Sequence, residues 1–194
     1  MLFSIIEYIK YLFRSFHLHG IHSPFVFDLD KNIFKQKIPY YSFDEIESIR
    51  AKLILTEKEI KILDLGAGSK KLPQHSRKVS EIAKSSLKSD KFAQLLYRMA
   101  FEFKPDFIIE LGTSFGITTS YLGKACPNSI IYSLEGSPEI AKIAKINFKK
   151  LKLENISIIV GDFNDTLSKT LSKFKQVDMV YFDGNHQEKA TIEY

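Results

Sequence analysis

Two stretches of the sequence join an apolar run to an acidic residue and closely spaced glycines, as turns that hold nucleotides do. The first is KILDLGAGSKKL at residues 61–72, and the second is FIIELGTSFGITTS at residues 107–120. In such a turn the glycines let the backbone approach the ligand, and the helix that follows points its first N–H groups at it. A single nucleotide-binding fold needs one turn of this kind, so the residues after each stretch decide between them.

The residues after the glycines favour the second stretch. A ligand-holding turn opens a helix and then reaches a second strand that ends in an acid, which binds the ribose hydroxyl groups. After Gly68 the chain contains Pro73, which interferes with a helix, and no apolar strand follows in the next 25 residues. After Gly116 a helical pattern starts at once, and the strand IIYSL leads to Glu135. We therefore expect the second stretch to hold the ligand and the first to form a turn, with a lid near the site as the alternative.

The spacing of the glycines in the second stretch also bears on the ligand. Dinucleotide sites use G-x-G-x-x-G, whose glycines let a pyrophosphate approach the helix. Here Gly112 and Gly116 stand four residues apart, and Glu110 precedes them. A carboxylate at that place would repel a pyrophosphate, whereas it suits a ligand that carries a cationic amine.

From about residue 89 onward, apolar runs of strand type alternate with helical patterns. This alternation predicts a Rossmann-like, doubly wound α/β fold with a mainly parallel sheet and helices on both faces. Ligands of such sheets bind beyond the carboxyl ends of the strands. The expected strands are 107–111, 130–134, 156–160 and 177–182, and the expected helices between them are 116–125, one opened by Ser137-Pro138, and 165–174.

The residues before this alternation indicate a helical extension, so we divide the chain into residues 1–88 and a Rossmann-like domain, 89–194. MLFSIIEYIKYLFRSF predicts an amphipathic helix, and a second helical pattern runs from Asp44 to about Glu59. The first segment is interrupted by charges and too short to cross a bilayer, so neither a targeting nor a transmembrane segment is expected. We expect the extension to cover the site or to form a homodimer contact; attachment to a membrane surface is the alternative.

Composition argues against several other classes of protein. The net charge of +5 comes mostly from lysines spread over helical segments, without a basic stripe among aromatic residues, so no nucleic-acid partner is expected. The single cysteine, Cys126, excludes an intrachain disulfide and fits a cytoplasmic location. His17, His19 and His22 match no common zinc spacing, so we assign no metal to them.

The second stretch resembles a known motif. ELGTSFGITTSYL is similar to motif I of class I S-adenosylmethionine-dependent methyltransferases, above all to the catechol and caffeoyl-CoA O-methyltransferase branch. The similarity begins near Ser89 and continues through Glu135 and IIVGDF to VYFDGNH. The preceding half, with HGIHSPFVF, resembles a bacterial family of uncharacterised methyltransferase-like proteins.

The resemblance implies that this half of the chain binds S-adenosyl-L-methionine. Glu110 would meet the methionine amino group, and Glu135 would accept hydrogen bonds from both ribose hydroxyls. Asp162 would accept a hydrogen bond from the adenine amine, with Phe163 as an aromatic wall or, alternatively, as part of the core. The other cofactor-binding residues implied are Gly112, Thr113, Ser114, Gly116, Thr118, Gly136 and Ser137.

The resemblance also suggests two catalytic residues. Asp183 would lie next to the sulfonium, and His186 would act as general base for a hydroxyl or amine, or else have a structural role. In the catechol-type branch the matching Asp also binds a divalent metal that polarises the acceptor. The further ligands of that metal come from positions that this chain does not contain. We therefore assign no metal ligand, and a divalent metal held by Asp183 with Asn185 or His186 stays an open alternative.

The expected activity is transfer of a methyl group from S-adenosylmethionine to an oxygen or nitrogen nucleophile of a small-molecule acceptor. The class has seven strands and we count four, with the apolar strand 177–182 left at a sheet edge, so we expect a truncated chain with weak or no turnover. Two alternatives stay open: an NAD-dependent oxidoreductase, and a non-catalytic module that binds the cofactor or a partner.

Overall fold

The computed structural model describes residues 2–14, 22–36, 42–63, 75–184 and 188–193. The chain forms two compact units, Met1–Ile38 and Pro39–Tyr194.

The first unit is helical. Helix α1 (Leu2–Arg14) confirms the helix predicted at the start of the chain. Helix α2 (Pro24–Leu29) begins after Ser23, whose Oγ accepts a hydrogen bond from the N–H of Val26, and it continues into a π-helical turn, η2 (Asp30–Phe34). Apolar side chains of α1 are exposed: Phe3, Ile5, Ile6, Tyr8, Ile9, Tyr11, Leu12 and Phe13. Among the described residues, no helix has both the length and the apolar character that crossing a membrane requires.

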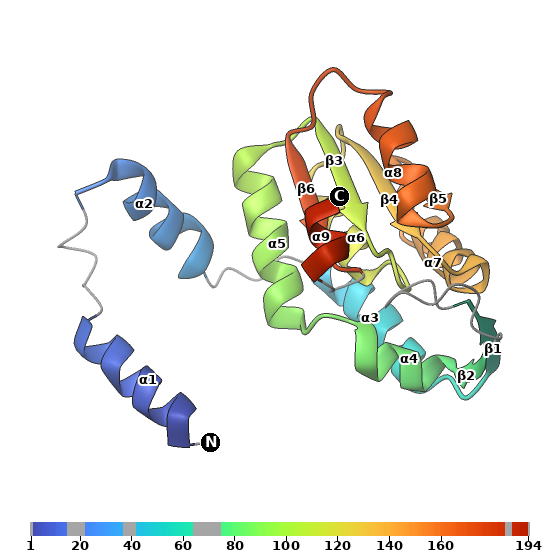
Figure 1. Ribbon diagram of the computed structural model, residues 1–194, viewed down its shortest axis with the longest axis horizontal. Helices are drawn as coiled ribbons and strands as arrows, with labels where there is room; N and C mark the ends of the chain where they lie inside the picture. Colours follow the sequence, from blue (N-terminus) through green and yellow to red (C-terminus); the bar gives the residue numbers. More distant parts are fainter. Residues whose placement is uncertain (1, 15–21, 37–41, 64–74, 185–187, 194) are drawn as a thin grey trace. The chain divides into compact units, whose positions relative to one another are not determined.

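The second unit contains a four-stranded parallel sheet in the order β5-β4-β3-β6 (Figure 1). All four predicted strands are confirmed; β4 extends to Glu135, and β6 begins two residues later than expected, at its first residue paired with β3. The strands are β3 (Phe107–Leu111), β4 (Ile130–Glu135), β5 (Ile156–Val160) and β6 (Met179–Phe182). The helices are α5 (Asp90–Phe103), α6 (Ile117–Ala125), α7 (Pro138–Lys150), α8 (Phe163–Leu171) and α9 (Glu188–Glu193).

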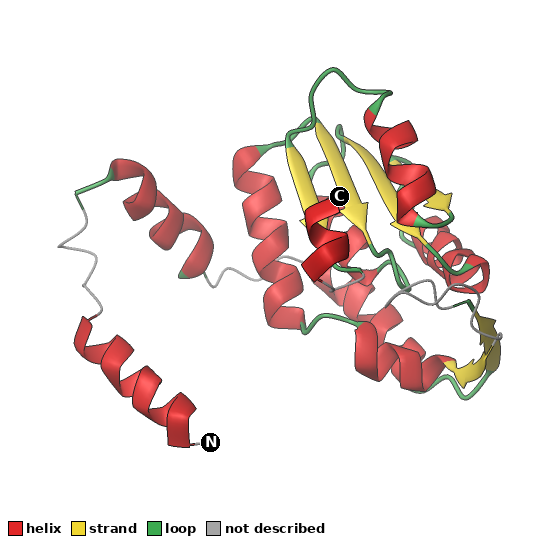
Figure 2. Ribbon diagram, in the orientation of Figure 1, coloured by secondary structure: helices red, strands yellow, loops and turns green. Residues whose placement is uncertain are grey.

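Helices cover both faces of this sheet, as the sequence predicts, because its strands carry apolar residues on both sides (Figure 2). Ile108 and Ile131 face a large core that includes residues of α5 and α6. Ile109 and Leu134 face the other way, into a smaller cluster with Leu167 of α8. Glu110 shares the face of Ile108, since side chains alternate along a strand.

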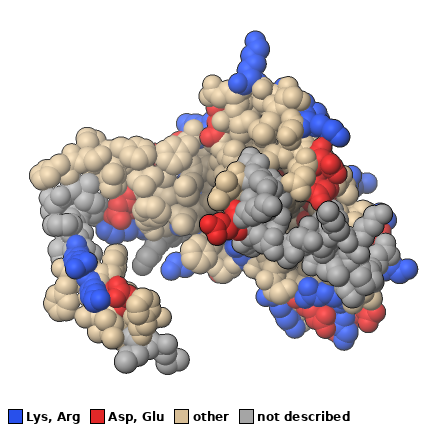
Figure 3. Space-filling model, in the orientation of Figure 1, with Lys and Arg blue, Asp and Glu red and all other residues tan. Residues whose placement is uncertain are grey.

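On the molecular face drawn in Figure 3, the Lys and Arg side chains lie in several groups with Asp and Glu between them.

Within the second unit, the elements that precede α5 share the large core. They form α3 (Ser42–Ile54), the antiparallel pair β1 (Glu59–Ile62) and β2 (His75–Lys78), and α4 (Val79–Ser86). Ile46, Ile60 and Ile82, one from each of α3, β1 and α4, are buried in that core. The expectation of a helix reaching Glu59 is wrong, because this residue starts β1 and pairs with Lys78. The glycines of residues 61–72 lie outside the described residues.

Candidate functional site

The carboxyl ends of the four strands are tied together by backbone hydrogen bonds. Because the chain runs from β3 to β4 to β5 and then returns to β6 on the other side of β3, strand order reverses beside β3. Such a reversal is where doubly wound sheets bind ligands. The bonds are Gly112 N–H to Leu134 O at 2.9 Å, Gly161 N–H to Glu135 O at 3.0 Å, and Asp183 N–H to Leu111 O at 2.8 Å.

The turn between β3 and α6 needs glycine at two places. Gly112 has φ of 102°, and a Cβ there would stand 2.5 Å from the carbonyl oxygen of Asp183. Gly116 has φ of 76°, and a Cβ there would stand 2.5 Å from the ring of Phe148. Both positions therefore combine a left-handed backbone with close packing inside the chain itself. Their approach to a ligand stays a prediction.

Glu135 lies at the end of β4, where the sequence predicts it, and backbone N–H groups hold its carboxylate. Its Oε2 accepts a hydrogen bond from Ser114 N–H at 2.8 Å, and its Oε1 accepts one from Ser137 N–H at 2.9 Å. Burial raises the pKa of Glu135, and the N–H donors of Ser137, Ser114 and Gly136 oppose that rise. Each carboxylate oxygen keeps a further lone pair, so the group can also accept from two ligand hydroxyls.

Glu110 is fully buried beneath the same turn. Its Oε2 accepts hydrogen bonds from Thr119 Oγ1 and Ser133 Oγ, each at 2.5 Å. Its Oε1 is buried and has no hydrogen-bond partner among the described residues. Burial raises the pKa of Glu110 to about 8, and the negative charges of Asp183 and Glu135 add to the rise. A cation at Oε1 would satisfy the unpaired oxygen and favour the ionised carboxylate.

Hydroxyl groups near the turn are engaged inside the protein. Thr113 Oγ1 lies 2.5 Å from Ser133 Oγ, and Ser114 Oγ lies 2.9 Å from Ser86 Oγ. Thr118 is buried in the first turn of α6. The neighbouring residue, Thr119, donates to Glu110, as Ser133 does, and no sequence pattern indicates either contact.

Asp162 and Phe163 follow β5. The Oδ1 of Asp162 accepts a hydrogen bond from Asn164 N–H at 2.9 Å, so it caps α8, which begins two residues earlier than predicted. The helix also ends earlier than predicted, at Leu171. Phe163 is partly buried and packs against the smaller core cluster. A Cβ on Gly184 would stand 2.7 Å from its ring, so Phe163 also lies beside the chain that leaves β6.

Asp183 directly follows β6, and its side chain is 12% exposed. Its Oδ1 lies 2.7 Å from the Nζ of Lys88, and its Oδ2 accepts a hydrogen bond from the hydroxyl of Tyr181 at 3.2 Å. Lys88 is a further residue that the sequence analysis missed, since it is one lysine among many. His186 and Asn185, like His17 and His19, lie outside the described residues.

No cluster of three or more His, Cys, Asp or Glu side chains that could hold a metal ion is found in the part of the chain that the structure describes.

Comparison with known proteins finds similarity to methyltransferases. A family model described as a methyltransferase domain matches residues 109–194. Protein-L-isoaspartate O-methyltransferase 1 of Archaeoglobus fulgidus is 39% identical over 59 residues, which are 28% of this chain and 26% of that protein.

Two solved structures share the fold. One is an O-methyltransferase from Bacillus cereus in complex with S-adenosylhomocysteine, with 19% identity, a TM-score of 0.57, and coverage of 85% of this chain and 64% of that one. The other is a methyltransferase of Podospora anserina with S-adenosylhomocysteine bound, with 19% identity, a TM-score of 0.55, and coverage of 88% and 61%. The chain thus spans less than two thirds of the length of each of these three proteins. Residues 109–194 are thus similar in sequence to a methyltransferase domain, and the unit that contains them shares its Rossmann-like fold with the two solved methyltransferases.

Proposed function

We propose that the protein containing this chain binds S-adenosylmethionine and transfers its methyl group to an oxygen or nitrogen nucleophile of a small-molecule acceptor. The match of residues 109–194 to a methyltransferase domain supports the reaction class. The two structural relatives, both solved with S-adenosylhomocysteine, support the identity of the cofactor.

The observation that carries this proposal is the carboxylate of Glu135. It stands at the end of the strand next to β3 and is fixed by the N–H groups of Ser114 and Ser137. A fixed carboxylate with free lone pairs suits the two neighbouring hydroxyls of a ribose. Asp162, the residue before α8, follows the end of the neighbouring strand β5. There it would accept a hydrogen bond from the adenine amine, with Phe163 beside the adenine.

The other end of the cofactor fits the buried oxygen of Glu110. The cofactor's α-ammonium group would supply the partner that Oε1 lacks, directly or through a water molecule. The remaining residues that we propose to line the cofactor are Gly112, Thr113, Ser114, Gly116, Thr118, Gly136 and Ser137.

The bound cofactor would supply a methyl group already activated by its sulfonium. The residues of this chain would hold the donor in line with the acceptor and exclude water. Asp183, at the switch of strand order, would lie near the sulfonium, and its negative charge suits that cation. His186 is our proposed base, which would take the proton from the acceptor. A divalent metal at Asp183 would polarise the acceptor, and loss of methylation on addition of a chelator would reveal it.

Three further proposals concern residues 1–88, the location of the protein in the cell and the kind of acceptor. Residues 1–88 would supply a cover or a homodimer contact, and the exposed apolar side chains of α1 support an interaction of that helix. The single Cys126, which is buried, fits a cytoplasmic protein. The acceptor is proposed to be a small molecule.

The test is titration calorimetry of the purified protein with S-adenosylhomocysteine. Replacing Glu135 by Ala removes a charged acceptor of two ligand hydroxyls, so we expect affinity to fall about 10- to 100-fold. Glu154→Ala, an exposed acid on the chain before β5, is the matched control and should leave the affinity unchanged. Unchanged affinity in Glu135→Ala would contradict the assignment, and no binding by the wild-type protein would contradict the proposed cofactor.

Two further measurements separate the alternatives. Binding of NADH in place of S-adenosylhomocysteine would favour an oxidoreductase. Binding of the cofactor without methylation of any acceptor in a broad screen, with and without a chelator of divalent metals, would favour a binding module.

A further inference from the structure

The last residue of α4, Ser86, and the short connection to α5, residues 87–89, lie beside the turn of the proposed cofactor site. Ser86 Oγ lies 2.9 Å from Ser114 Oγ, which belongs to that turn. Two residues further on, the Nζ of Lys88 lies 2.7 Å from Asp183 Oδ1, at the end of β6. The connection therefore places a cation at the carboxyl edge of the sheet, beside the point where strand order reverses.

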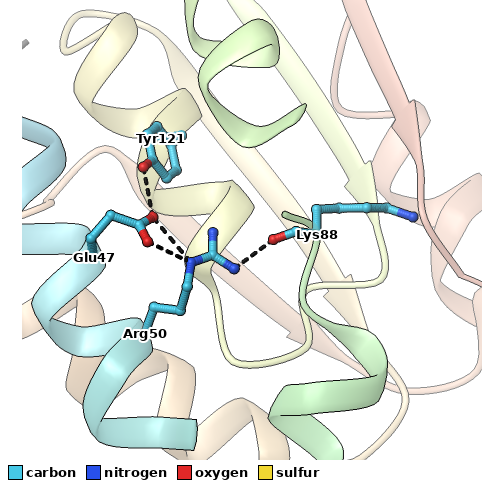
Figure 4. Close-up of polar contacts among 4 residues, drawn as sticks. All are labelled: Glu47, Arg50, Lys88 and Tyr121. Carbon is cyan, nitrogen blue, oxygen red and sulfur yellow. Dashed lines mark hydrogen bonds and ion pairs between the residues drawn. The ribbon is translucent and has the colours of Figure 1, made fainter. Parts of the chain in front are cut away.

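A network on the other side of Lys88 holds its backbone in place (Figure 4). The Nη1 of Arg50 donates a hydrogen bond to the carbonyl oxygen of Lys88 at 2.5 Å, and its Nε donates to Glu47 Oε2 at 2.8 Å. The hydroxyl of Tyr121 donates to Glu47 Oε1 at 2.7 Å. The side chain of Arg50 is 11% exposed and Tyr121 is fully buried, so this anchor is largely shielded from water. Figure 4 shows the side chain of Lys88 extending away from it.

The charges around this edge are mostly negative. Glu110 is the last residue but one of β3, Glu135 ends β4 and Asp183 follows β6, and the charges of Asp183 and Glu135 both act on Glu110. A ligand carboxylate placed among these acids would be repelled unless a cation stood beside it. An ammonium group has three N–H donors. The contact of Lys88 with Asp183 Oδ1 uses one of them.

The methionine end of S-adenosylmethionine carries an α-ammonium and an α-carboxylate side by side. The unpaired Oε1 of Glu110 suits the ammonium, and the Nζ of Lys88 suits the carboxylate. We propose that Lys88 binds the α-carboxylate of the cofactor, with Asp183 aiming the ammonium group of Lys88 and the Arg50 network fixing its backbone. This inference rests on the proposed function and adds to it a residue that recognises the amino-acid end of the donor.

The competing explanation is that Lys88 only balances the charge of Asp183. A partly exposed ion pair of that kind contributes little to stability. The two explanations differ in one respect: only the first makes the effect of Lys88 depend on whether the ligand has a carboxylate. A pair of ligands that differ in that group therefore separates them.

The experiment compares S-adenosylhomocysteine with 5′-methylthioadenosine, which keeps the adenosine and the thioether but lacks the amino-acid end. Affinities for both are measured by calorimetry on the wild-type protein, Lys88→Met, Lys88→Arg and the control Lys91→Met, an exposed lysine in the first turn of α5. Thermal melting of each variant confirms that it is folded.

We expect Lys88→Met to weaken S-adenosylhomocysteine binding about 10- to 100-fold, the effect of one charge-assisted hydrogen bond, and to leave 5′-methylthioadenosine binding unchanged. Lys88→Arg should recover most of the loss, and Lys91→Met should behave as wild type. Equal affinity of wild type and Lys88→Met for S-adenosylhomocysteine would overturn the inference, as would an equal loss for both ligands. If the wild-type protein binds 5′-methylthioadenosine and not S-adenosylhomocysteine, both this inference and the proposed cofactor are wrong. If it binds S-adenosylhomocysteine with an affinity that does not depend on Lys88, only this inference is wrong and the proposed cofactor remains.

Discussion

The two acid-and-glycine stretches, residues 61–72 and 107–120, have similar sequences and lie in different structural settings. The second connects parallel strand β3 to helix α6, so its turn lies at the carboxyl edge of the sheet with Glu135 beside it. The first is flanked by β1 and β2, which pair antiparallel in a separate two-stranded sheet. The strands that flank the two stretches therefore differ, and the helix and the strand ending in Glu135 that follow the second stretch are the features that favour it as the ligand-holding turn.

The largest expected effect on stability should come from truncating one buried residue of the large core in each of the two regions. Ile108 of β3 is fully buried and Ile60 of β1 is 7% exposed, and both face the large core. Truncation to Ala should lower the free energy of unfolding by about 3–5 kcal/mol at Ile108 and by about 2–3 kcal/mol at Ile60. Urea unfolding measures both. A neutral Ile60→Ala would mean that the hairpin is not part of the folded core.

A somewhat smaller loss is expected from the glycines. Gly112→Ala should lower the free energy of unfolding by about 3 kcal/mol, because a φ of 102° strains an L residue and the added Cβ meets the carbonyl of Asp183. Gly66→Ala, the counterpart in the first stretch, should cost about 1 kcal/mol or less, as for an ordinary turn glycine. Equal losses would show that the first stretch has an equally strict backbone requirement.

The acid of the second stretch should make stability depend on pH. Because burial raises the pKa of Glu110 from 4.5 to about 8, the ligand-free folded state keeps a proton that the unfolded state releases. Stability is therefore highest below pH 4.5 as far as this group is concerned, and it falls as pH rises towards about 8, by up to about 1.4 kcal/mol per pH unit.

Glu110→Gln cannot ionise, so its stability relative to wild type should increase from about pH 5 to about pH 8. Urea midpoints of both proteins across that range measure the difference. A constant difference would show that Glu110 has no raised pKa. The cofactor should reduce the slope, because the ligand ammonium favours the ionised carboxylate.

The smallest expected effect is on the acid of the first stretch. If residues 61–72 do not hold the cofactor, Asp64→Ala should change the affinity for S-adenosylhomocysteine by less than about twofold, as a substitution outside a site does. Calorimetry beside Glu135→Ala gives the contrast. A loss as large as that of Glu135→Ala would assign the first stretch to the site and break the comparison.

Much of the sheet could be predicted from the sequence. The strands at 107–111 and 156–160 have the predicted bounds, because a parallel strand covered on both faces needs an uninterrupted apolar run. The position of Glu135 followed from the same pattern, since it is the first acid after an apolar run. The predicted start of α8 is two residues late, because Asp162 caps the helix and the helix therefore begins at Phe163.

The region before the sheet was predicted less well. The helical pattern from Asp44 predicts a helix to about Glu59, whereas α3 ends at Ile54 and β1 begins at Glu59. Strand β1 has four residues and forms by pairing with β2. The two strands are separated in sequence, and no local pattern indicates that they pair. Short strands of this kind depend on a distant partner more than on their own propensity.

By itself, the sequence determined which segments between residues 107 and 182 become strands, which acids end them, and where the backbone must turn through glycine. These are local properties of burial and backbone conformation. Only the tertiary structure decided that Thr119 and Ser133 would hold Glu110, and that Lys88 would meet Asp183. Contacts of this kind join residues far apart in the chain, and they depend on the order of the strands and on the packing of α4 and α5, which the spacing of residues does not specify.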